Sequence, residues 1–394
     1  MKMDGYCVLD LSLFLPDPML TQMLADHGAE VIKIVPPPGA GEPVRNVGYH
    51  SGGQSVWFRN THRGKKSVVL NLKDKDDLSV FLELCKTADV LPEAFWPGVV
   101  ERLGIGPDAL RALNPYLVYA SISAFGQTGL EAHRPAHDLA IEAMAGVVSL
   151  NLGQDDQPTN PHMPVADVTG AMTALTGILM ALLRREKTGQ GDCIHVSMQD
   201  ATMAWLPNVV GPVFAKNRPP HVKEERSFGG YAFYSIYQTS DRKHVALGGV
   251  EVKFVHTFLN ALERVDLIPI SCGPSGSTQE PFLDFLTEIF KTRTRAEWEN
   301  WFQDKDICFA PVLDLKETWA QPQVASCEML LRDQARNLHI GTPLKFKNEP
   351  GSPSLTLPEL DEHGNMFRKK LSDWVRTQAS SRQPVSELRY GYCD

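Results

Sequence analysis

YCVLDLSLFLPDPMLTQMLADHGAEVIKIV, residues 6–35, contains the alternation of elements that decides the fold. Residues 6–15 have the apolar character of a buried strand, and residues 19–26 have the period of a short helix. Gly28 fits the position just past a helix end, and residues 30–35 form a second apolar run. A strand, a helix and a strand in so short a stretch predict a βαβ unit, and with it a parallel sheet and a right-handed crossover.

The same alternation recurs further along the chain. Asp167 stands at the start of the longest helical period and is the expected N-cap of a helix that runs to Arg185. Lys187 and the glycines up to Gly191 are typical of the end of that helix. The other expected strands are 67–71, 89–91, 117–122 and 193–197, and the other expected helices are 78–87, 107–113, 139–148 and 199 onward. The sequence therefore predicts an open α/β layer.

A second, smaller unit is indicated after a proline-rich stretch. Residues 207–226 contain four prolines and are only weakly periodic, which is typical of a linker. Beyond it, alternating residues at 231–237 and 244–247 predict a hairpin, and 253–262 and 295–302 have helical periods. We expect a small α+β domain here.

The bulk composition excludes several classes of protein. The formal net charge is −8 over 394 residues, with no dense basic patch, which argues against nucleic acid as a partner. The seven cysteines are scattered without zinc-ligand or redox spacing, so we expect reduced thiols and no metal site. No secretory signal is visible, and the most apolar stretch, residues 172–183, is too short to span a bilayer. We expect a soluble cytoplasmic protein that does not enter a membrane.

Three residues are candidates for catalysis. Asp167, at a helix N-terminus, would lie where orphan N–H groups and the helix dipole favour an oxyanion, although it can equally be a plain helix cap. His137 follows a proline-set loop and precedes a helix, which suits either a general base or a hydrogen-bonded structural histidine, with Asp138 as the N-cap. Glu251 lies between a strand and a helix, where it can partner a histidine or simply complement the helix dipole.

Four cations are candidates for binding phosphates. Arg63, Lys65 and Lys66 precede an expected strand, and Arg45 lies upstream of them. Such a group can clamp phosphate oxygens, and a solvated loop is the alternative. The nearby glycine-rich stretch 39–43 lacks the P-loop pattern.

The combination of motifs resembles the class III coenzyme A transferases, a family that also contains the α-methylacyl-CoA racemases and relatives of carnitine-metabolising and bile-acid-inducible enzymes. The resemblance covers nearly the whole chain and is carried by residues 24–34, 101–106, 113–115, 121–129, 134–139, 166–170 and 187–191. It implies an acyl-CoA thioester as substrate, with coenzyme A as part of that substrate and no tightly bound cofactor. It also implies that Asp167 is the catalytic carboxylate.

The resemblance implies an unusual architecture as well. A Rossmann-like large domain would be built from both chain ends, and two chains would interlock as a homodimer. The implied large domain is 1–200 with 337–394, the linker 201–226, the small domain 227–316 and the return linker 317–336.

Two chemistries are known in such families. In the transferases, the carboxylate matching Asp167 attacks the thioester and forms an anhydride and then an aspartyl-CoA thioester. In the racemases, the residues matching His137 and Asp167 exchange the α-proton through an enolate, and one matching Glu251 assists the histidine. Transferases often carry an aromatic residue at the place of His137, so the full triad favours a racemase or epimerase of 2-methylacyl-CoA. The amides at the Asp167 helix are expected to hold the enolate oxygen.

Two departures from the family pattern concern coenzyme A. Trp96 stands where the family usually has an arginine that helps hold coenzyme A, and Asp17 replaces the glycine of a common Pro-Gly-Pro. The residues expected to contact coenzyme A are therefore Trp96, Arg45, Arg63, Lys65 and Lys66. A non-catalytic acyl-CoA-binding homologue is the remaining alternative.

Overall fold

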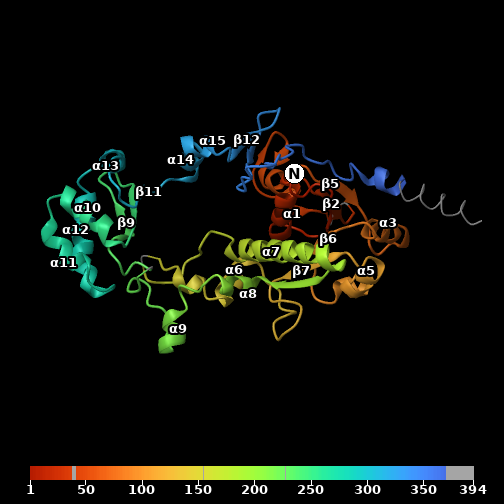
Figure 1. The fold of residues 1–394 in the computed structure, drawn as a ribbon, viewed down its shortest axis with the longest axis horizontal. Coiled ribbons are helices and arrows are strands. Elements are labelled where there is room, and N and C mark those ends of the chain that lie inside the picture. The colour runs from red at the N-terminus through yellow and green to blue at the C-terminus, as the bar shows by residue number, and fades with distance from the viewer. Residues whose placement is uncertain (38–40, 154, 227, 370–394) are drawn as a thin grey trace, which may run out of the picture. The chain divides into compact units, whose positions relative to one another are not determined.

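The computed structural model describes residues 1–37, 41–153, 155–226 and 228–369. The chain divides into two compact units, which are coloured along the sequence in Figure 1. Unit 1 combines residues 1–145 and 163–203 with the segment from 327 onward, and unit 2 combines 146–162 with 204–326. Residue 227 and residues 370–394, which belong to the predicted small and large domains, lie outside the described residues.

Unit 1 is built on one parallel sheet of six strands, which confirms the predicted α/β layer. The strands are β1 (Cys7–Asp10), β2 (Glu30–Val35), β5 (Lys66–Val69), β6 (Val90–Glu93), β7 (Val118–Ser123) and β8 (Cys193–Ser197). Their spatial order is β5-β2-β1-β6-β7-β8. Counted along the chain this is the 3-2-1-4-5-6 order of a doubly wound sheet, whose direction of winding reverses between β1 and β6.

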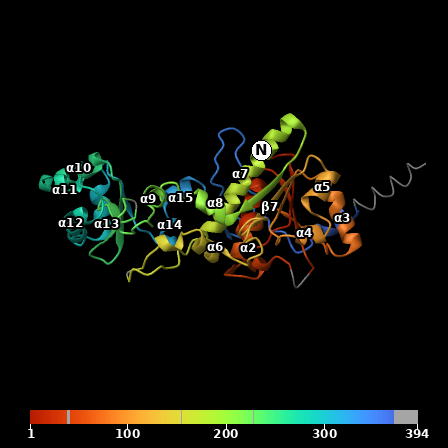
Figure 2. The same cartoon turned by 90° about the horizontal axis from the view of Figure 1, so that it is seen from below.

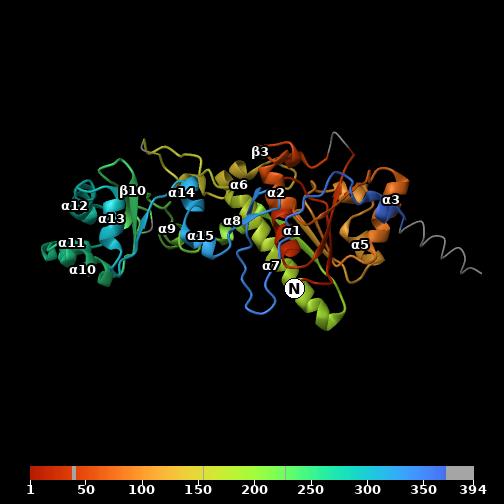
Figure 3. The same cartoon turned by 90° about the horizontal axis from the view of Figure 1, so that it is seen from above.

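Helices cover both faces of this sheet. The first face carries α1 (Pro16–Asp26) and α7 (Val165–Thr188), and the second carries α3 (Lys75–Cys85), α4 (Val99–Arg102) and α5 (Pro107–Leu113). Successive strand residues point to opposite faces, so that Val8 packs beneath α1 and α7 while Leu9 packs beneath α3. Figure 2 shows α7 running along the sheet beside β7, and Figure 3 shows α3 near α5.

Helix α7 is longer than its sequence pattern predicted and begins earlier. Its N-cap is Pro164, so Asp167 is the third helical residue and the prediction of an Asp167 cap is wrong. The end is as predicted, because Gly189 takes the left-handed conformation (φ 66°) that glycine tolerates best. By length and composition α7 alone among the described helices could cross a membrane, but half of its most apolar window is buried inside the protein. Packing against the sheet therefore accounts for its apolar character.

The connection between β1 and α1 differs from its prediction. Strand β1 ends at Asp10 rather than continuing to residue 15, and α1 begins at Pro16. Proline suits the first turn of a helix because its missing N–H would have no partner there. Between them Phe14 has a positive φ of 65°, which no strand residue adopts.

The outer edge of the sheet is covered by side chains from the C-terminal part of unit 1. The N–H of Ser67 in edge strand β5 donates to Nδ1 of His363 at 3.2 Å, and the N–H of Val69 donates to Oδ1 of Asp361 at 2.7 Å. These contacts satisfy amides that an open edge would offer to another chain.

Unit 2 has a small antiparallel sheet under a helical layer. Strands β9 (Tyr234–Gln238) and β10 (His244–Gly248) form the predicted hairpin, and β11 (Phe309–Pro311) adds to β10. Helices α10 (Val252–Ala261), α12 (Glu280–Phe290) and α13 (Arg295–Phe302) enclose an aromatic core around Phe258 and Trp298. Helix α12 was not predicted.

Shorter elements complete the two units. The remaining helices are α2 (Val56–His62), α6 (Asp138–Met144), α8 (Met198–Ala204), α9 (Gly211–Lys216), α11 (Ile268–Ser271), α14 (Leu315–Trp319) and α15 (Pro322–Ser326). The remaining strands are β3 (His50–Ser51), β4 (Gln54–Ser55), β12 (Leu330–Arg332) and β13 (Leu338–Ile340). The segments predicted as linkers thus contain α9 and, on the return, α15 and β12.

Candidate active site

A cavity of about 710 Å³ opens in unit 1 at the carboxyl ends of the strands. Its walls come from the loops that follow β1, β6 and β7, together with His137, Asp167 and Met198. This is the crevice where doubly wound sheets bind ligands, because the connections on either side of β1 and β6 leave in opposite directions. We call it the acyl cavity below, after the acyl-CoA substrate that the sequence leads us to expect.

Asp167 reaches the acyl cavity from the first turn of α7. The side chain is half-buried, and its backbone N–H donates to Oδ1 of Asp138 at 3.0 Å. Burial, with the added charges of Asp138 and Glu142, raises the pKa of the Asp167 carboxyl to about 7. A carboxyl with this pKa can both accept and return a proton at neutral pH.

Two carboxylates of α6 cap the first turn of α7. Oε1 of Glu142 accepts from the N–H of Val165 at 2.9 Å, as Asp138 accepts from Asp167. The prediction that these amides hold an enolate oxygen is therefore wrong for Val165 and Asp167, since both already have acceptors. Glu142 is buried with its second oxygen unpartnered, and burial, then Asp138, raises its pKa to about 7.

His137 lies on the same cavity wall as Asp167, at the start of α6. It is itself the N-cap residue, and Asp138 is the first helical residue rather than the predicted cap. The imidazole is exposed and meets the ring of Phe14 edge to face, with centroids 6.1 Å apart and planes at 79°. The fold thus brings His137 and Asp167, separated by a loop and a helix in the sequence, to one cavity.

Glu251 is the third predicted catalytic residue and belongs to unit 2. It is the N-cap residue of α10, and its exposed side chain makes no capping hydrogen bond. A carboxylate in this position is available to a partner from elsewhere. Its pairing with His137 stays a prediction.

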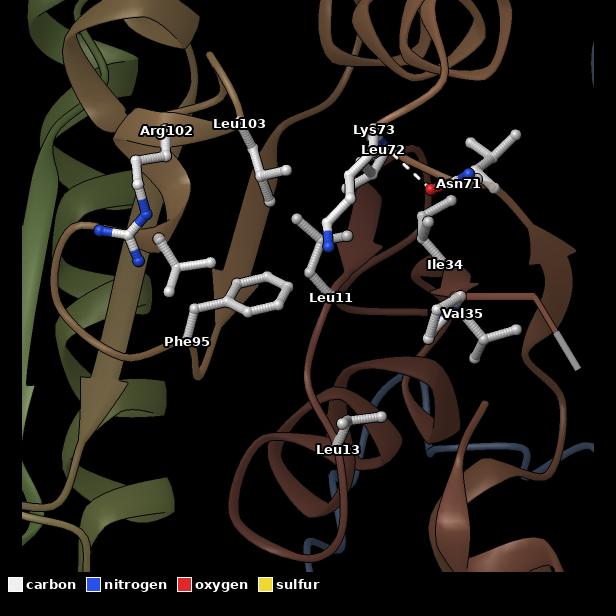
Figure 4. A pocket seen from close by; sticks show the side chains of 13 residues that line it. Leu11, Leu13, Ile34, Val35, Asn71, Leu72, Lys73, Phe95, Arg102 and Leu103 are labelled. Carbon is white, nitrogen blue, oxygen red and sulfur yellow. Dashed lines mark hydrogen bonds between the residues drawn. The ribbon is translucent and has the colours of Figure 1, made fainter. Parts of the chain in front are cut away.

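A second cavity, of about 610 Å³, adjoins the acyl cavity. The two share Leu13, Phe95, Val99 and Arg102 in their walls. Its other walls are the ends of β2 and β5, and they are mainly apolar. Figure 4 shows the Arg102 guanidinium on one side of Phe95 and the Lys73 side chain on the other. An apolar slot with two cations can hold a phosphorylated group beside a flat ring.

Arg102 and Lys73 were missed by sequence reasoning. Lys73 follows the predicted strand 67–71 almost directly, so the rule that ligands bind at the carboxyl ends of parallel strands indicates it. Arg102 had no such signal, because only the packing of α4 brings it to the shared wall.

Arg63 and Lys65 do not face either cavity. Nζ of Lys65 is fully buried and donates to Asp10 Oδ2 at 3.0 Å and to Thr21 Oγ1 at 2.7 Å. Arg63 is also buried and pairs with Asp26 at 2.5 Å. Both cations neutralise carboxylates within the fold, which corrects their prediction as phosphate ligands.

Arg45 and Lys66 have intramolecular partners too. The guanidinium of Arg45 lies 4.0 Å over the ring of Phe58 and donates to the carbonyl of Pro358 at 3.0 Å. Lys66 forms an ion pair with Glu30. Neither residue lines the two cavities, so the four predicted cations do not form one clamp.

The two departures from the family pattern lie on and behind the wall of the acyl cavity. Trp96 lines the cavity with 61% of its surface exposed, so it offers a large flat face to a ligand. Asp17 is fully buried behind that wall, and neither carboxyl oxygen has a hydrogen-bond partner. Burial, with the charges of Asp10 and Glu93, raises the pKa of Asp17 well above its usual range.

Comparison with known proteins identifies this arrangement. The family model for CoA-transferase family III matches residues 3–364. The chain belongs to CoA-transferase family III. Both cavities and all three candidate catalytic residues fall within the matched range, so this family III enzyme has its candidate site inside the shared fold.

Relatives of both chemistries are found among similar proteins. Acetyl-CoA:oxalate CoA-transferase of Acetobacter aceti is 33% identical over 94% of this chain and 95% of its own length. Alpha-methylacyl-CoA racemase of Homo sapiens is 32% identical over 92% of this chain and 94% of its own length. The crystal structure of a CAIB/BAIF family protein from Brucella suis superposes with a TM-score of 0.81 at 25% identity, covering 94% of this chain and 99% of that one. Overall identity therefore does not distinguish racemase from transferase.

Proposed function

We propose that this family III enzyme epimerises a 2-methylacyl-CoA by 1,1-proton transfer. The observation that supports this most directly is that His137 and Asp167 line one cavity, with the pKa of Asp167 raised to about 7. Two side chains that can bind and release a proton at one cavity are what removal and return of an α-proton require. The racemase of Homo sapiens that resembles this chain performs a reaction of this class by its name.

The proton balance is simple. One base removes the α-proton, and the electron pair of that C–H bond forms the enolate double bond while charge moves to the thioester oxygen. The conjugate acid of the other base then protonates the opposite face of the same carbon. No bond to sulfur breaks, and coenzyme A stays attached throughout.

The two adjoining cavities support the binding of an acyl-CoA. The acyl group would lie in the acyl cavity beside Asp167, and the nucleotide end would lie in the second cavity. There Arg102 and Lys73 would contact phosphates, and Trp96 would pack against the connecting chain. The residues shared by the two linings place the two cavities side by side, as the two parts of one acyl-CoA would require.

A CoA-transferase is the second candidate function. The observation that favours it is the similarity to acetyl-CoA:oxalate CoA-transferase at 33% identity. In this reaction the Asp167 carboxylate would attack the thioester carbonyl and expel the thiolate of coenzyme A, which forms a mixed anhydride. The transferase reaction would need no proton-accepting role for His137.

One experiment separates the two functions. A single enantiomer of a 2-methylacyl-CoA is incubated with the enzyme in deuterated water, and α-deuterium and configuration are followed by NMR and chiral chromatography. We expect deuterium at the α-carbon with loss of configuration. H137A and D167N should each lose epimerisation, and each should lose α-proton exchange from the enantiomer whose proton its missing base removes. Absence of α-deuterium, together with a hydroxamate of Asp167 after hydroxylamine treatment in the presence of acyl-CoA and oxalate, would instead show the transferase.

We further propose that two chains form an interlocked homodimer in the cytoplasm, in which Glu251 assists His137. Light scattering coupled to gel filtration measures the assembly, and a mass near 44 kDa, that of one 43.7 kDa chain, would exclude the dimer. E251Q is expected to slow exchange while leaving that mass unchanged.

A further inference from the structure

Phe14 has a backbone conformation that a residue of its kind seldom adopts. Its φ is 65°, in the left-handed region, where the side chain of an L-amino acid crowds the following carbonyl group. Such a conformation persists only where the surroundings hold it, and it is enriched at functional sites. Phe14 lies on the wall of the acyl cavity.

A buried carboxylate holds this conformation. The N–H of Phe14 donates to Oε1 of Glu42 at 3.1 Å. The other oxygen of Glu42 lies 3.4 Å from Nζ of Lys33 and 3.4 Å from Nε2 of His62. Burial opposes ionisation of Glu42, but contact with His62 and the charge of Lys33 lower its pKa to about 2. The acceptor is therefore ionised throughout the range in which the enzyme would work.

The ring that this backbone presents meets the imidazole of His137. The two ring planes meet at 79°, and their separation is that of an edge-to-face aromatic pair. Among the residues that the structure describes, no hydrogen bond to the imidazole accompanies this contact. The orientation of an exposed ring without a hydrogen bond depends on what packs against it.

We propose that Phe14 is a positioning residue for His137, held in its left-handed conformation by the Glu42 carboxylate so that its ring fixes the plane of the imidazole. The inference rests on the proposed function, in which His137 exchanges the α-proton. It goes further by assigning to Phe14 and Glu42 a role on one face of the substrate only. Asp167 reaches the cavity from another element, α7, and serves the opposite face of the α-carbon in the proposed reaction, so that face should not depend on Phe14 or Glu42.

The test measures each face separately. In deuterated water, the initial rate of α-proton loss is measured from the R and from the S enantiomer of 2-methylacyl-CoA. H137A identifies the enantiomer whose proton His137 removes. F14Y keeps the ring and F14L removes it, while both keep a side chain at a left-handed position, so the pair isolates the ring contact.

We expect F14L to slow proton loss from the His137-dependent enantiomer at least about tenfold, since small errors of position cost this much in catalysis. We expect loss from the other enantiomer to change less than about twofold, and F14Y to remain within about twofold for both. F14G, which relieves the backbone strain, should resemble F14L in rate while folding at least as well. E263G removes a comparable strain (φ 57°) at an exposed position of unit 2 and controls for glycine itself.

The outcomes separate the two proposals. If H137A exchanges both enantiomers as fast as the wild type, the proposed function fails, and the role of Phe14 fails with it. If H137A is impaired but F14L is not, or if F14L slows both enantiomers equally, only the positioning role is overturned. Thermal unfolding followed by circular dichroism shows that each variant compared is folded.

Discussion

Replacing Asp167 by asparagine should make the protein more stable at pH 8 and abolish its activity. The pKa of Asp167 rises from 3.8 to about 7 in the folded protein, chiefly by burial. The folded state therefore binds a proton more tightly than the unfolded state, and ionising the carboxyl costs stability as pH rises through that window. About three pH units at about 1.4 kcal/mol each set an upper limit of about 4 kcal/mol. Because the side chain is only half-buried, water screens part of this cost, and we expect about 1–3 kcal/mol.

Urea unfolding of wild type and D167N at pH 5, 6, 7, 8 and 9 measures the effect, at one protein concentration so that assembly does not contribute. The advantage of D167N should already be present in part at pH 5, grow up to about pH 7 and then stay constant. D200N, at an exposed aspartate in the first turn of α8, supplies the background of the same substitution. A D167N variant that is no more stable than the wild type at pH 8, or whose advantage does not grow with pH, would refute the assigned burial and charge repulsion.

Three further predictions concern one residue of the cavity walls and two residues of the helices α6 and α7. R102A should raise the KM for acyl-CoA roughly tenfold or more with little change in kcat, because a charge-assisted phosphate contact contributes equally to ground and transition states. A change confined to kcat would contradict a phosphate contact of Arg102. E142Q removes a negative charge near Asp167 and should lower the acidic pKa of the kcat/KM profile by about half a unit to one unit. A rise of that pKa in E142Q would exclude charge repulsion from Glu142. G170A should lower the free energy of unfolding in urea by about 1–3 kcal/mol despite the helix preference for alanine, because its Cβ would lie 2.6 Å from Cγ of Met198. The double variant with M198A should recover part of that loss, and an unchanged unfolding midpoint in G170A would show that the Met198 side chain moves aside freely.

The sheet and its helices could be predicted because their patterns are local. Strand 30–35 and helix 107–113 have the bounds in the structure that the sequence predicted. The first βαβ unit was also recognised, although its first strand ends earlier and its helix begins earlier than predicted. The apolar period and the turn residues that determine such elements lie within a few neighbouring positions of the sequence. Asp167 and His137 were likewise found from motifs that are continuous in the sequence.

The failures concern contacts between distant segments. The capping of α7 depends on Glu142 and Asp138, which lie over twenty residues earlier, and no local rule indicates that they displace Asp167 from the cap position. Lys65 precedes β5 and Asp10 ends β1, and β2 lies between these two strands in the sheet. The burial of Lys65 beside Asp10 therefore follows from the order of the sheet, which a cationic stretch in the sequence does not show. The left-handed conformation of Phe14 was invisible for the same reason, since its acceptor is on another loop.

The cover on edge strand β5 has a consequence for synthesis of the chain. His363 lies 296 residues after Ser67, the amide that it covers. At about 5–20 residues per second, a ribosome takes roughly 15–60 s to make the intervening chain. Within that interval the other five strands of the sheet are completed, the last of them at Ser197, while β5 keeps its outer amides open to any strand nearby. Nascent chains of this protein should therefore depend on a chaperone that shields β5 until the last part of unit 1 has left the ribosome.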